Sequence, residues 1–129
     1  MKKLDKESVI GISALLVHAA NIDEIYSDHE KNLVKDFIKS YLNEENTEEI
    51  LKKAESVEND SNQLLNYTNI IKQNNNEIKK DIIEHLWKVI ISDNSVDQYE
   101  SNLMRRICGL IYFPDKESAE IKLRLLNSK

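Results

Sequence analysis

The sequence predicts an all-α protein, a compact bundle of about seven helices. Three observations support this fold class. Only two Gly and one Pro occur in 129 residues, which is too few for a turn-rich sheet protein. Lys and Glu, which are good helix formers, occupy many polar positions. Apolar residues recur at a spacing of three and four, which is the period of one helix face.

Each expected helix has a start signal and an apolar stripe. Asp5 or Ser8 caps the first helix, and Thr47 caps the third. The central Asn74–Asn76 is the clearest loop. The stripe of the last helix consists of Ala119, Leu123 and Leu126. The expected helices cover about residues 6–20 and 28–42, Thr47 through Val57, Asp60 through Ile71, 77–92, 98–112, and Asp115 through Leu126.

An internal repeat organises the chain as two related halves, at about residues 9–42 and 79–112. Asp23–Glu30 aligns with Asp93–Glu100, and each segment lies between two apolar helical runs. We therefore expect a helix, a tight acidic corner and a second helix, made twice within a single domain over residues 1–129. Cys108 aligns with Ile38 and Trp87 with Val17, so both are expected in the core.

The acidic corners have a structural interpretation. Ser27 and Glu30 form a capping box, in which each side chain accepts a backbone amide of the other residue. Asp97 and Glu100 form its acidic version. Each Glu lies in the first turn of a helix, where the helix dipole favours a negative charge. On this interpretation the carboxylates stabilise the corners and bind no metal ion.

A second interpretation is a divalent-cation site for Ca²⁺ or Mg²⁺. Oxygen ligands at alternate positions are typical of calcium loops. The candidate ligands are Asp93, Asp97 and Glu100 in the second corner, and Asp23 and Glu30 in the first. The second corner departs from an EF-hand, because Gln98 stands where the loop glycine belongs and Met104 where the bidentate Glu belongs. Both interpretations of the corners stay open.

Composition and motifs exclude several function classes. The net charge of −5 does not favour nucleic acid, which attracts basic surfaces. The single cysteine excludes an internal disulfide and a multi-cysteine zinc site. No glycine-rich phosphate loop or nucleophile motif occurs, so an enzyme is not expected. The N-terminus loosely imitates a secretory signal, but Asp5 and Glu7 interrupt its basic region. We expect a cytoplasmic protein that does not insert directly into a membrane.

The two repeat halves carry a family resemblance. The residues concerned are Ala14–Ala20, Asp23, Ser27–Glu30, Leu86–Ile90, Asp93, Asp97, Glu100 and Leu103–Ile107. This arrangement resembles the TerB-like family of tellurite-resistance-associated helical domains, in particular its small stand-alone group, over about residues 9–126. The glycine that follows each Asp in the family is Glu24 and Asn94 here.

The resemblance implies a helical fold of two related halves and a link to tellurite and general stress responses. It implies no enzymatic activity, and it allows a divalent-cation role for the corners. Related domains occur fused to J-domain co-chaperones and to membrane-associated partners. We therefore expect a non-enzymatic interaction module with protein partners, with a cation-binding sensor as the alternative. The oligomeric state does not follow from the sequence.

Overall fold

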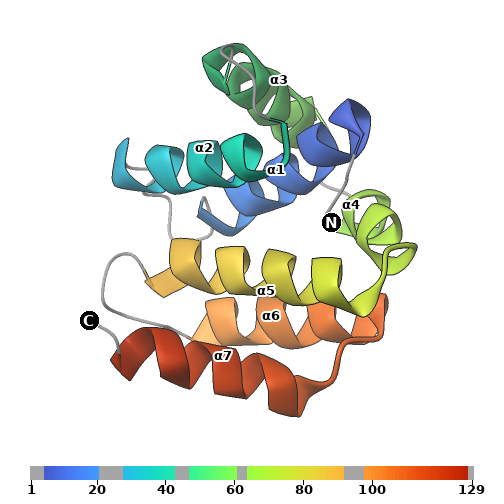
Figure 1. Ribbon diagram of the computed structural model, residues 1–129, viewed down its shortest axis with the longest axis vertical. Helices are drawn as coiled ribbons and strands as arrows, with labels where there is room; N and C mark the ends of the chain where they lie inside the picture. Colours follow the sequence, from blue (N-terminus) through green and yellow to red (C-terminus); the bar gives the residue numbers. More distant parts are fainter. Residues whose placement is uncertain (1–4, 21–27, 43–46, 61–63, 92–97, 128–129) are drawn as a thin grey trace.

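The computed structural model describes residues 5–20, 28–42, 47–60, 64–91 and 98–127, which form seven α-helices and no strand. The all-α prediction is confirmed. Every boundary that the sequence predicts within these ranges lies within a few residues of the observed one. The helices are α1 (Lys6–Ala20), α2 (Asp28–Leu42), α3 (Thr47–Asp60), α4 (Leu64–Lys72), α5 (Asn76–Ile91), α6 (Gln98–Ile111) and α7 (Asp115–Asn127) (Figure 1).

Helix α1 is the centre of one half of the bundle. It packs against α2, α3, α4 and α5. From Val9 to Ala20 every side chain is buried except Ile10 and His18, which are half-buried. A helix that is apolar on all sides must be covered on all sides, which explains the long apolar run near the N-terminus. The segment that imitates a secretory signal is therefore the most buried helix of the protein.

Gly11 lets α1 approach α4 closely. A Cβ atom at this position would lie 2.6 Å from the Cδ1 atom of Ile70, so that side chain would have to move. The distance is well below ordinary van der Waals contact between carbon atoms. The absence of a side chain at Gly11 therefore leaves room for the end of the Ile70 side chain between the two helices.

Side chains satisfy the backbone groups at several helix ends. The Oδ1 atom of Asp5 accepts the amide of Ser8 at 2.7 Å, so Asp5 is the cap of α1. Asn75 caps α5 in the same way, accepting the amide of Ile78 at 2.9 Å. Helix α6 ends on Tyr112, whose φ of 60° is left-handed. The amide of Phe113 then donates to the carbonyl of Cys108 at 2.9 Å, which is a Schellman closure.

Helix α7 lies at the opposite end of the molecule from α3 and packs mainly against α5 (Figure 1). The predicted inward stripe of this helix is wrong. Ala119 is exposed, and Leu123 and Leu126 are 58% and 37% exposed. Ser118 and Ile121 face the core instead. The spacing of the leucines marks one face of a helix, but it does not say whether that face is covered.

The two repeat halves correspond to α1 with α2 and to α5 with α6. Helix α1 packs directly against α2, whereas the main neighbours of α6 in the described part of the chain are α4 and α7. The equivalence of the halves therefore stays a prediction. The core positions derived from the repeat are occupied as expected, since Cys108 is 1% exposed and Trp87 is 4% exposed.

Candidate functional site

Most of the predicted corner ligands lie outside the described residues. Asp23 belongs to residues 21–27, and Asp93 and Asp97 belong to residues 92–97, none of which the structure describes. Glu100 lies in the first turn of α6, but its side chain is also outside the described part. Glu30 lies in the first turn of α2 and is 7% exposed. No group of three acidic, His or Cys side chains suited to a metal occurs among the described residues.

The helix ends that flank the two corners lie on the same side of the molecule (Figure 1). These are the last residues of α1 and α5, Ala20 and Ile91, and the first residues of α2 and α6, Asp28 and Gln98. Helix α5 packs against both α1 and α2. The helix ends on this side therefore come from two parts of the chain that are far apart in the sequence.

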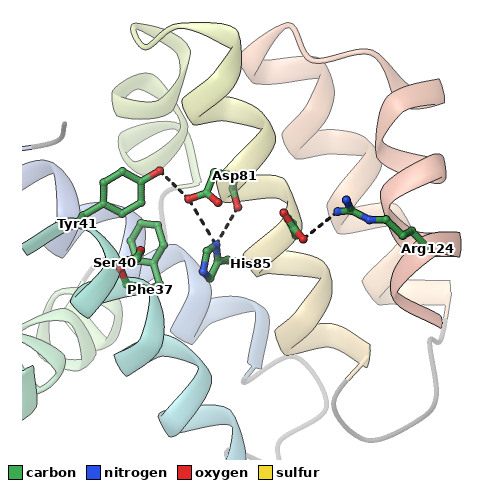
Figure 2. Close-up of polar contacts among 7 residues, drawn as sticks. Phe37, Ser40, Tyr41, Asp81, His85 and Arg124 are labelled. Atoms are coloured by element: carbon green, nitrogen blue, oxygen red, sulfur yellow. Dashed lines mark hydrogen bonds and ion pairs between the residues drawn. The ribbon is translucent and has the colours of Figure 1, made fainter. Parts of the chain in front are cut away.

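A polar cluster joins α2 to α5. The hydroxyl of Tyr41 donates to the Oδ2 atom of Asp81 at 2.7 Å (Figure 2). The Nδ1 atom of His85 lies 2.9 Å from the backbone carbonyl of Asp81 and 3.7 Å from its Oδ2 atom. A carbonyl only accepts, so Nδ1 carries the proton. The ring of Phe37 meets the ring of His85 edge to face, with centroids 5.2 Å apart.

This cluster holds two helices in register, and Tyr41 stays protonated in it. Burial raises the pKa of the Tyr41 hydroxyl, and the hydrogen bond to the Asp81 carboxylate raises that pKa further. The sequence gives a weak indication of this cluster, because Asp81 and His85 are four residues apart and so lie on the same face of one helix. Tyr41 comes from the other half of the chain, so only the fold brings it to this pair.

The other histidines are separate from this cluster and from each other. The Nδ1 atom of His18 lies 3.4 Å from an oxygen of Glu58, at a half-buried contact between α1 and α3. His29 is exposed at the start of α2.

The single cysteine, Cys108, lies in the core. Burial raises the pKa of the Cys108 thiol, which accords with a structural cysteine.

An open pocket of about 450 Å³ lies between α5, α6 and α7. Trp87 forms its buried floor, and the indole Nε1 donates to the Oγ of Ser118 at 2.9 Å. The Nζ atom of Lys122 lies 5.3 Å from the centroid of the Trp87 ring, within cation–π range. Met104 and Arg105 line the side formed by α6. We call this site the Trp87 pocket. Sequence analysis placed Trp87 in the core, and so missed the pocket above it.

The side of α7 that borders Lys80 and Glu84 of α5 carries mixed charge. Arg124 donates to the carboxylate of Glu84 on α5 at 2.8 Å, as Figure 2 also shows. Lys80, Glu117 and Glu120 surround a smaller hollow of about 160 Å³ beside this ion pair. The charges on this side are interspersed, as is usual for a solvated helix face.

A family model connects this fold to known proteins. The model described as tellurite resistance protein TerB matches residues 10–123. The chain belongs to the TerB family. The match spans α1 to α7 and both predicted corners, so the resemblance of the sequence to this family is confirmed. No curated protein and no solved structure matches the chain.

The helices of this TerB-family chain are too short or too polar to cross a bilayer. Within the described ranges, none combines the length and the apolar character that a membrane span requires. Helix α1, the most apolar, has 15 residues, whereas a span needs about 20.

Proposed function

We propose that this TerB-family protein is a non-enzymatic interaction module in a tellurite-resistance or stress response. It works in the cytoplasm by binding protein partners, including membrane-associated ones, and it neither binds nucleic acid nor inserts into the bilayer. Membership of the family supports the link to tellurite resistance. The binding role is our inference from the surface of the protein.

The observation that carries the binding role is the outward apolar face of α7. Leu123 is 58% exposed and Leu126 is 37% exposed, whereas the apolar residues of α5 are almost fully buried. Single exposed leucines are ordinary, but these two lie one turn apart on the same helix. Ala119, one turn before Leu123, lines the Trp87 pocket, so the apolar surface extends from the leucines to the pocket. Apolar surface gathered in this way is typical of protein–protein contacts.

The test combines growth with partner capture. The full-length tagged chain is expressed in a strain that lacks its own TerB-family protein, and growth is scored with and without tellurite. We expect the chain to restore growth in tellurite and to co-purify reproducibly with a defined protein partner. Restored growth with no enriched partner, together with turnover of a substrate by the pure protein, would contradict the proposal.

A divalent-cation sensor is the second candidate function. Its support is the arrangement of the helix ends that flank the two corners, which lie on one side of the molecule. The ligands in this proposal are Asp93, Asp97 and Glu100, with Asp23 and Glu30 as additional ligands. Carboxylates of this kind would suit Ca²⁺ or Mg²⁺, which prefer oxygen ligands.

Thermal unfolding across a panel of divalent metals tests the sensor. A metal at about 100 times its dissociation constant should stabilise the wild type by roughly 2.7 kcal/mol. The variant Asp93→Asn with Glu100→Gln should lose this gain, while Glu48→Gln, on the exposed face of α3, should keep it. Equal metal responses in the wild type and the corner variant would rule out these ligands.

A further inference from the structure

We infer that the outer face of α7 and the adjoining Trp87 pocket form a groove for an acidic amphipathic helix of a partner protein. The inference rests on the proposed binding function and assigns it a surface and a partner chemistry. The outer face of α7 carries Ala119, Leu123 and Leu126, with the charged Asp115, Lys116 and Lys122 beside them. By helical spacing these residues lie on one side, and Ala119 and Lys122 also line the pocket.

The pocket supplies a place for a side chain. Its floor is the buried Trp87, fixed by the hydrogen bond to Ser118, so its shape does not depend on a mobile rotamer. Met104 adds an adaptable apolar wall. The volume of about 450 Å³ is ample for one large apolar side chain. An anchor in such a pocket, with further contacts at i+4 and i+7, is the usual way a helix lies in a groove.

The charge around the groove selects the partner. Arg105 and Lys122 line the pocket, and Lys116 lies on α7 one turn before Ala119. Asp115 is the one acidic side chain of the lining among the residues that the structure describes. Within the described part of the chain, neither Arg105 nor Lys116 takes part in an ion pair. Among the described residues, the lining therefore has two positive side chains against one negative, on a protein whose net charge is −5, and its electrostatic complement is an acidic segment.

Two other occupants fit these observations less well. A second copy docked by a twofold axis would bring two copies of the same surface together, so the cations Arg105 and Lys122 would meet no added acidic partner. An anionic membrane would attract the cations, but a bilayer surface would leave the pocket unfilled and would meet only two exposed leucines. A helix fills the pocket, covers both leucines and neutralises the rim.

Selection from a display library tests the partner chemistry directly. The probes are amphipathic helical peptides with a fixed apolar stripe, flanked by Glu, Gln or Lys, and they are selected against the full-length protein. Trp87 is the only tryptophan of the chain, so its fluorescence reports binding at the pocket. We expect Glu-flanked peptides to be enriched and to change this fluorescence.

Variants locate the peptides on the surface. Leu123→Glu should weaken the selected peptides about tenfold or more, because an apolar contact is lost and a like charge is introduced. Arg105→Glu should weaken Glu-flanked peptides and favour Lys-flanked ones. Lys53→Glu makes the same charge change on α3, at a side chain that is 51% exposed, and should leave binding unchanged. Equal melting temperatures show that each variant is folded.

Several outcomes would overturn the inference. These are enrichment of Lys-flanked or uncharged peptides, no enrichment at all, and binding that Leu123→Glu leaves intact. Co-sedimentation with phosphatidylserine vesicles without peptide binding would assign the face to membranes, and dimerisation lost in Leu123→Glu would assign it to a second copy. The wider proposal fails separately. If a partner co-purifies equally with the wild type and with Leu123→Glu, the proposal of an interaction module stands but the proposal that the partner binds at this groove is wrong.

Discussion

Single side chains connect parts of this protein that are distant in the sequence. The hydroxyl of Tyr41 donates to Asp81 across the contact between α2 and α5, and the indole of Trp87 donates to Ser118 across the contact between α5 and α7. Each bond pairs a polar group that would otherwise be costly beside the core. Helix α5 is therefore hydrogen-bonded through side chains to α2 and to α7, in addition to its apolar contacts.

Removing the Tyr41 hydroxyl tests the first of these ties. At neutral pH, Tyr41→Phe should lower the free energy of unfolding by about 1 kcal/mol, because the bond to Asp81 is lost. The pKa of Tyr41 is raised in the folded state, so the native state favours the protonated hydroxyl. This contribution is present below the unfolded pKa of about 10 and is lost as the pH rises above it.

Denaturant unfolding of the wild type and Tyr41→Phe from pH 7 to pH 11 measures this effect. The difference in the free energy of unfolding between the wild type and Tyr41→Phe should be constant up to about pH 9. It should become smaller above the unfolded tyrosine pKa of about 10. Lysines also titrate in this range, but they are common to both proteins and cancel in the difference. A gap that widens with pH would contradict the assigned role of Tyr41.

Ser13 offers a prediction of opposite sign. It lies in the middle of α1 with no exposed surface, and its Oγ atom has no hydrogen-bond partner among the described residues. A buried hydroxyl without a partner costs about 1–3 kcal/mol. We therefore expect Ser13→Ala to raise the free energy of unfolding by about 1 kcal/mol, measured in urea. A clear loss of stability would show that the hydroxyl is paired in solution.

At the scale of elements, α1 and α7 are opposites. Both carry apolar residues at helical spacing, leucines among them, but α1 is covered by four other helices whereas one apolar face of α7 points to solvent. The same residue type therefore has different roles in the two helices. Leu15 has no exposed surface and Leu123 is 58% exposed, so they form a matched pair for mutation.

Leu15→Ala should destabilise the protein by about 2–5 kcal/mol, because it opens a cavity in the core. Leu123→Ala removes the same atoms from a solvated face and should change the free energy of unfolding by less than about 0.5 kcal/mol. Urea denaturation of both variants gives the comparison. A large loss for Leu123→Ala would mean that its face is covered in the isolated protein.

At the scale of the whole molecule, the helical fold follows from the sequence because most stripes face the core. The stripe of α6, from Leu103 to Ile111, is buried as predicted, and so is that of α5. Asn75 caps α5 beside the predicted central loop. These features depend on capping residues and on the spacing of apolar residues, and both can be read from a single sequence.

The surface features do not follow from the sequence, because they depend on which helices become neighbours. The outward direction of Leu123 is set by Ser118 and Ile121, which turn the other face of α7 towards the core. The tie from Tyr41 to Asp81 joins residues 40 positions apart. The corner ligands were predicted from a motif, but Asp93 and Asp97 lie outside the described residues, and their role stays a prediction.

Site-specific photocrosslinking in cells tests the central claim that this TerB-family protein works by binding a protein partner at α7. A benzophenone side chain is placed at position 123, and at position 53 on α3 as the control. We expect position 123 to give one dominant adduct with another protein, through an acidic amphipathic segment, and position 53 to give none. Identical adducts at both positions, or no adduct at position 123 in cells exposed to tellurite, would contradict the account.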